Sequence, residues 1–179
     1  MKNVRKYLTM AGIATAVAVM PITAYGGILK GSQSETVSAG KVAYEFKSGD
    51  TMITMGAESK DVIKALGNPV KPVFEQESCA YQGKDKVYTY EGFELSTYPA
   101  DGKEYISSVY IPDKSSIATP EGIKIGSTAK EVVDIYGKEY DKEEAKFGTY
   151  CYTSDSAVLK IYTAKDKVDS IEYLINTKK

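Results

Sequence analysis

Apolar positions recur with helical spacing in two segments of this chain, 53–67 and 123–137. In each segment three apolar residues fall on one face of a helix, and a glycine follows where that helix is expected to end. The apolar residues are Val62, Ile63 and Leu66 in the first segment and Val132, Val133 and Tyr136 in the second; the glycines are Gly67 and Gly137. Thr128 and Glu131 also have the spacing of a capping box. The pattern predicts one short amphipathic helix in each segment.

After each helix, apolar and polar residues alternate with the period of β-strands. Strands are expected at 87–90, 93–98 and 105–111 after the first helix, and at 149–152, 157–162 and 168–175 after the second. Further short strands are expected at 42–46 and 78–81. Turns containing Gly, Asp or Ser separate the strands, as in antiparallel hairpins. An antiparallel meander therefore follows each helix.

The two helical segments are alike in sequence at an offset of 70 positions. The identical pairs are Ile53 and Ile123, Gly56 and Gly126, Lys60 and Lys130, Val62 and Val132, and Gly67 and Gly137. This likeness predicts an α+β fold of two tandem repeats, each a short amphipathic helix followed by an antiparallel β-meander, with the sheets side by side. The expected divisions are a flexible leader at 27–41, repeat 1 at 42–112, a linker at 113–122 and repeat 2 at 123–176.

The first 26 residues have the pattern of a bacterial signal peptide. Lys2, Arg5 and Lys6 precede an apolar run from Leu8 to Val19, and small residues near Gly26 suit signal peptidase. The run is shorter than the roughly 20 residues that span a bilayer, which favours a cleaved signal over a retained anchor. We expect an extracytoplasmic protein, either secreted or associated with the cell surface.

Composition excludes several kinds of chemistry. The chain has no His and no Trp, and its single Arg is Arg5. Histidine-based catalytic triads, His-ligated zinc and arginine clamps on phosphate are therefore excluded. Cleavage after Gly26 would leave 20 basic (23 − 3) and 24 acidic residues, a net charge of −4. Such a chain is not expected to bind nucleic acid, to insert into membranes or to need a cofactor.

Two cysteines, Cys79 and Cys151, remain in the chain after signal cleavage. An exported protein permits a disulfide between them, and two separate buried thiols are the alternative. Their spacing offers no Cys-x-x-Cys motif for redox catalysis.

Tyrosine is over-represented, with 15 Tyr against 4 Phe. Strand alternation points Leu95, Thr97, Leu159 and Ile161 toward the core, so that their neighbours share the opposite face. The candidate partner-binding residues on that face are Tyr98, Tyr162, Tyr110, Glu94, Ser96, Lys160 and Glu172. Tyrosine is enriched in protein-binding surfaces, but it also suits half-exposed strands, so both interpretations stand.

The order Ile-x-x-Gly-x-(Ser/Thr), helix, closing glycine and meander, present twice between roughly residues 53 and 175, resembles the tandem-repeat β-lactamase inhibitory proteins. It is also similar to the small assembly-lipoprotein domains of the bacterial outer membrane, which carry one copy. The resemblance implies two α+β units whose sheets join into a wide curved surface that grips a protein. The chain departs from the inhibitors in having one Cys per copy and neither Trp nor His.

Two further segments carry chemical motifs. Ser127 and Lys130 match the Ser-x-x-Lys motif of penicillin-recognising serine enzymes, but the partner motifs Lys-Thr-Gly and Ser-Asp-Asn are absent from the sequence. The acidic stretch 139–144 lacks the alternating ligands of a calcium loop, and we interpret it as a solvated loop.

The function expected from the sequence is that of a secreted, non-catalytic bacterial module that binds another protein and possesses no cofactor. Inhibition of that partner is one form this activity would take. An envelope-assembly or structural module is the alternative, and a small Ser/Lys hydrolase is a remote one. The partner itself is not identified by any motif.

Overall fold

The computed structural model describes residues 43–178. The predicted signal peptide at 1–26 and the leader at 27–41 lie outside the described residues. The helices and strands, in chain order, are β1 Phe46–Ser48, β2 Thr51–Ile53, α1 Ser59–Leu66, β3 Phe74–Glu77, β4 Lys84–Tyr90, β5 Phe93–Ala100, β6 Lys103–Ile111, α2 Ala129–Tyr136, α3 Lys142–Ala145, β7 Thr149–Thr153, β8 Ala157–Ala164 and β9 Lys167–Ile175.

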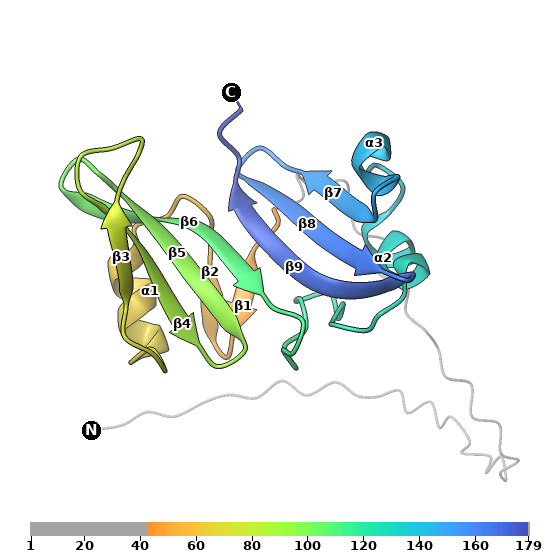
Figure 1. The fold of residues 1–179 in the computed structure, drawn as a ribbon, viewed down its shortest axis with the longest axis horizontal. Coiled ribbons are helices and arrows are strands. Elements are labelled where there is room, and N and C mark those ends of the chain that lie inside the picture. Colours follow the sequence, from red (N-terminus) through yellow and green to blue (C-terminus); the bar gives the residue numbers. More distant parts are fainter. Residues whose placement is uncertain (1–42, 179) are drawn as a thin grey trace, which may run out of the picture. The chain divides into compact units, whose positions relative to one another are not determined.

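Seven strands form one antiparallel sheet in the order β3-β4-β5-β6-β9-β8-β7, and β1 and β2 form a separate hairpin (Figure 1). The strands β4 to β6 and β7 to β9 are the two predicted meanders. They join through β6 and β9, where Tyr110 pairs with Glu172 and Val109 with Tyr173. The predicted α+β class is confirmed.

The core covers one face of the sheet. Leu95, Thr97, Leu159 and Ile161 are all buried, as strand alternation predicts. The α1 helix and the β1–β2 hairpin lie behind the sheet in the view of Figure 1. Phe46 of the hairpin packs against Phe93 and Tyr173, with ring centroids 5.1 and 5.8 Å apart. The hairpin thereby contacts strands of both meanders.

Both predicted amphipathic helices are present. In α2 the Thr128 hydroxyl accepts a hydrogen bond from the Glu131 backbone N–H, and the Glu131 side chain accepts one from the Thr128 N–H, which completes the capping box. Both helices end at a glycine with positive φ, Gly67 at 76° and Gly137 at 87°. Residues with a Cβ adopt this conformation only with strain, which explains glycine at both positions.

Part of the tyrosine excess belongs to the core. Tyr152 is 1% exposed, and its ring lies 5.4 Å from that of Tyr136 and 6.3 Å from that of Tyr44. The Tyr152 hydroxyl donates to the carbonyl oxygen of Gly137 at 3.1 Å, which ties β7 to the end of α2. Aromatic contacts of this kind stabilise a core beyond simple burial. These tyrosines are therefore structural.

Three local predictions are wrong. The strand expected at 78–81 lies earlier, at Phe74–Glu77, and 78–83 form a loop in which the Ser78 N–H donates to the Gly83 carbonyl at 2.9 Å. Because all of β3 is exposed at the edge of the sheet, its residues show no apolar alternation. The first strand begins at Phe46 and not at 42. The acidic stretch 139–144 leads into α3, because the Asp141 carboxylate accepts the N–H groups of Glu143 and Glu144 and starts a helix.

Candidate functional site

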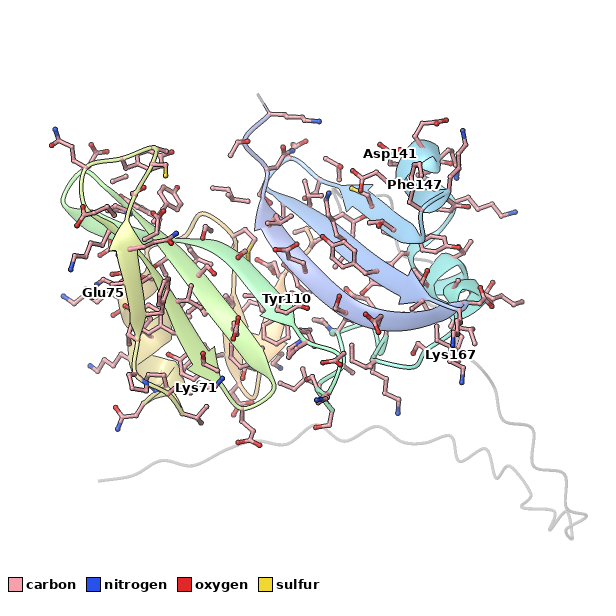
Figure 2. The ribbon with its side chains drawn as sticks, viewed as in Figure 1. Lys71, Glu75, Tyr110, Asp141, Phe147 and Lys167 are labelled. Carbon is pink, nitrogen blue, oxygen red and sulfur yellow. The ribbon has the colours of Figure 1, made fainter. Side chains whose placement is uncertain are left out.

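The predicted partner-binding residues lie on the sheet face opposite the core, which we call the outer face. Glu94, Tyr110, Glu172 and Lys160 are successive Cα partners across β5, β6, β9 and β8. Side chains of directly paired residues share one face of an antiparallel sheet. These four residues, which we call the outer row, therefore form one line that crosses both meanders. All four are half-buried, and Tyr110 stands on β6 where that strand meets β9 (Figure 2).

Hydrogen bonds order one end of the outer row. The Tyr162 hydroxyl donates to Glu172 Oε2 at 3.0 Å, and Lys160 Nζ donates to both carboxylate oxygens of Glu144, at 3.3 and 3.2 Å. Burial, followed by the hydrogen bond to Glu172, raises the pKa of Tyr162. The side chains of this end are therefore held in place and carry both signs of charge.

Tyr98 and Tyr162, two of the candidate partner-binding residues, do not lie side by side. Because β5 and β8 run in opposite directions, the two tyrosines are near opposite ends of the sheet. The pairing register separates them by about 20 Å along the strands and about 14 Å across them. Tyr98 instead packs between Tyr81 and Tyr105, with ring centroids 5.1 and 5.8 Å away.

A hollow of about 420 Å³ opens beside Tyr98 and Ser96, the two candidate residues that lie outside the outer row in the first meander. It is built from three segments: β3 with the loop after it, the facing parts of β4 to β6, and the end of β9. Its lining residues are Gln76, Ser78, Ala80, Tyr81, Asp85, Lys86, Val87, Ser96, Thr97, Tyr98, Ser107, Ile175 and Thr177. This volume is in the range of small-ligand sites.

An acidic side chain, Asp85, lines this hollow. Asp85 Oδ1 is covered from solvent, yet within residues 43–178 nothing donates a hydrogen bond to it. A buried polar atom without a hydrogen bond destabilises the fold by about 1–3 kcal/mol. The Asp85 carboxylate is therefore a feature that the fold itself does not explain.

The lysine that lines the hollow is neutralised by other groups. Lys86 Nζ lies 2.8 Å from Glu104 Oε2 and 3.9 Å from Glu75 Oε1. Burial alone would raise the pKa of Glu104, but the hydrogen bonds from Lys86, Thr97 and Tyr88 outweigh burial and hold that pKa below its usual value. Glu104 is therefore ionised at neutral pH and compensates the charge of Lys86.

Both cysteines are free thiols. Cys79 is exposed in the loop after β3, and Cys151 is half-buried on β7, next to Lys160 on the outer face. Burial, followed by the nearby Glu144 carboxylate, raises the pKa of Cys151. A thiol with a raised pKa is a poor nucleophile at neutral pH.

The Ser-x-x-Lys residues take part in local structure. The Ser127 hydroxyl accepts the Lys124 N–H at 3.3 Å, in the turn before α2. The Lys130 side chain is 81% exposed and pairs with Asp134, whose hydrogen bond raises the pKa of the Lys130 amine. An exposed, protonated lysine cannot activate a serine as a general base. Within residues 43–178 no three His, Cys, Asp or Glu side chains are grouped to hold a metal.

Sequence reasoning missed Tyr81, Asp85 and Tyr105. The sequence pattern predicts a strand at Tyr81, whereas this residue lies in the loop that borders the hollow. Asp85 could have been found by alternation, because it shares a strand face with Val87 two residues later. No pattern in the sequence, however, predicts that the end of β9 lies at the same hollow.

The fold and this surface define an α+β protein with an open sheet face. No family model and no curated protein matches the sequence. Among solved structures, the chain is similar to an extracellular protein containing an SCP domain from Bacillus anthracis str. Ames, with a TM-score of 0.46 and 13% sequence identity. The match covers 68% of this chain and 44% of the other, so this chain spans less than half the length of that protein.

The resemblance to β-lactamase inhibitory proteins and outer-membrane assembly lipoproteins is wrong, because the comparison with solved structures returns the extracellular SCP-domain protein instead. The motif on which it rested is a glycine turn, a helix cap and a terminating glycine. These features satisfy the ends of a short helix in any fold.

None of the helices within residues 43–178 has the length and apolar content that crossing a membrane requires.

Proposed function

We propose that this chain is a secreted bacterial protein that binds another protein through its outer face, without catalysis. The observation that carries the proposal is the outer row. The β6–β9 pairing places Glu94 and Tyr110 of one meander in line with Glu172 and Lys160 of the other. The row therefore spans four strands as one surface.

The chemistry of the outer row suits a protein partner. Tyrosine contributes a large contact area at small entropic cost, because its side chain has few rotatable bonds. Glu94, Glu172 and Lys160 add charges of both signs around Tyr110, and complementary charges on a partner would set its orientation. The half-burial of these side chains means that part of their conformational entropy is already lost before binding.

We also infer that the two meanders are tandem copies. In both, the glycine before the helix donates its N–H to a meander strand: Gly56 to the Ile106 carbonyl and Gly126 to the Val168 carbonyl, each at 2.8 Å. The register of β5 with β6 skips Ser107, the residue after Ile106, and that of β8 with β9 skips Asp169, the residue after Val168. Two such coincidences, beyond the sequence offset, support a duplication.

The test compares partner capture by two variants. Tyr110→Ala removes the aromatic centre of the outer row. Phe147→Ala is the matched control, because Phe147 is 86% exposed and lies in the loop before β7, away from Tyr110 (Figure 2). Each secreted protein is immobilised, exposed to the parent organism's culture medium and surface extract, and its bound proteins are measured by quantitative mass spectrometry.

We expect at least one protein whose recovery falls about tenfold with Tyr110→Ala and is unchanged with Phe147→Ala, since interface aromatics often contribute 2 kcal/mol or more, roughly 30-fold in affinity. Thermal melting of both variants checks that folding is intact. If Tyr110→Ala captures every protein as well as the wild type does, or if the losses follow Phe147→Ala, the outer face is not the binding surface.

A further inference from the structure

The hollow beside Tyr98 contains an uncompensated negative charge. Within residues 43–178 the Asp85 carboxylate forms no ion pair, and its Oδ1 accepts no hydrogen bond. Among residues 43–178, the only lysine that lines the hollow is Lys86, and it is neutralised by Glu104 at 2.8 Å. A positively charged group in the hollow would therefore gain a counter-ion here, and an anion would not.

Aromatic rings form the adjacent wall of the hollow. Tyr81 and Tyr98 both line it, with ring centroids 5.1 Å apart, and Tyr81 is 48% exposed at its rim. The electron-rich face of a tyrosine attracts a cation that approaches within about 6 Å of the ring centroid. The hydroxyl group of Ser96 adds a neutral oxygen that can accept an N–H hydrogen bond.

We propose that the hollow is a binding site for a primary ammonium group, presented by a lysine side chain of the protein partner. A carboxylate, tyrosine rings and a hydroxyl oxygen, all of which line the hollow, are the groups that recognise an ammonium ion on an alkyl stem. The volume of about 420 Å³ accommodates the whole side chain. This inference rests on the proposed binding function of the outer face, because it names the side chain that the partner inserts.

The probe is Nα-acetyl-lysine methylamide, added to the isotope-labelled secreted protein and followed by changes in NMR chemical shift. Nα-acetyl-norleucine methylamide is the neutral control of nearly equal shape, and n-butylamine tests whether a free amine suffices. We expect the lysine probe to bind with a dissociation constant on the order of 1 mM, as its size allows, and to shift the amide signals of Ser96 and Tyr98. The norleucine probe should bind at least tenfold more weakly.

Variants test the carboxylate directly. Asp85→Asn keeps the shape of the side chain and removes its charge, and should weaken lysine-probe binding at least fivefold. Asp113→Asn, at an exposed position of the linker, is the matched control and should leave binding unchanged. Equal binding of the lysine and norleucine probes to the wild type, or no binding of the lysine probe, would overturn the proposal even if Asp85→Asn failed to fold.

The outcome also separates this inference from the proposed function. Partner capture that depends on Tyr110, together with no binding of the lysine probe, keeps the protein-binding function and removes the ammonium site. Binding of the lysine probe without any capture that depends on Tyr110 keeps the site and removes that function. Binding of n-butylamine as tight as that of the lysine probe would overturn the assignment to a partner's lysine and identify a free amine as the ligand.

Discussion

The network around Glu104 should make a measurable contribution to stability. The Glu104 carboxylate accepts hydrogen bonds from Lys86 Nζ, the Tyr88 hydroxyl and the Thr97 hydroxyl, each at 2.8 Å. These donors come from β4 and β5, whereas Glu104 lies on β6. The substitution Glu104→Gln removes the charge and replaces one acceptor oxygen with an NH₂ group. This NH₂ group is a donor and would face groups that themselves donate hydrogen bonds in the wild type. One of the two oxygens through which Glu104 joins the three strands would then no longer accept a hydrogen bond.

The expected loss of stability is about 2–3 kcal/mol. Hydrogen bonds to charged groups contribute about 1.5–3 kcal/mol each, and breaking a fully buried ion pair costs about 3–5 kcal/mol. The side chains of Lys86 and Glu104 are still 30% and 23% exposed, so water replaces part of what is lost. For a domain of this size, about 4 °C per kcal/mol places the fall in Tm at about 8–12 °C.

The pH dependence of the stability that Glu104→Gln loses gives a second measurement. Because the folded-state pKa of Glu104 lies below its unfolded value, about 4.3, the network stabilises the protein fully above that pH. The stabilisation is lost as pH falls through the folded-state pKa, where the carboxyl becomes protonated. The difference in Tm between wild type and Glu104→Gln should therefore be largest near neutral pH and should narrow below about pH 4.3.

Thermal melting followed by circular dichroism at pH 7 and at pH 3–5 is the assay. Glu91→Gln is the matched control, because Glu91 is exposed in the turn between β4 and β5. It should melt within about 1–2 °C of the wild type, as expected for a surface substitution. If Glu104→Gln and Glu91→Gln melt alike at pH 7, or if the Tm difference widens in acid, the reasoning about this network is refuted.

Two further substitutions test the helix cap and a close backbone contact. Thr128→Ala removes the capping box of α2 and should lower the free energy of unfolding, measured by urea denaturation, by about 1 kcal/mol. Thr128→Ser should retain most of that stability. Equal losses of stability in the two variants would contradict the role of the cap. A Cβ at Gly148 would lie 2.7 Å from the Thr163 carbonyl oxygen, while one at Gly102, which also has positive φ, would meet nothing within 4 Å. The free energy of unfolding of Gly148→Ala should therefore be at least about 1 kcal/mol lower than that of Gly102→Ala. Equal free energies of unfolding would show that the contact relaxes.

Local patterns in the sequence were sufficient to predict the helices and most of the strands. The amphipathic spacing of Val132 and Tyr136, the capping pair Thr128 and Glu131, and the closing Gly137 all act within one or two helical turns. Alternation on β5 and β8 likewise determined which residues are buried, because successive side chains of a strand point to opposite faces. Alternation does not predict the edge strand β3, because an exposed strand needs no apolar alternation.

The tertiary structure alone decided which of these residues meet. The pairing of β6 with β9 brings Tyr110 beside Glu172, 62 positions later in the chain, and forms the outer row. The same pairing makes β5 and β8 antiparallel, which separates Tyr98 from Tyr162. The hollow likewise forms only because β4 and the end of β9 both line it. Contacts between segments so far apart in sequence depend on strand order and register, and the period of a single strand carries no information about its neighbours.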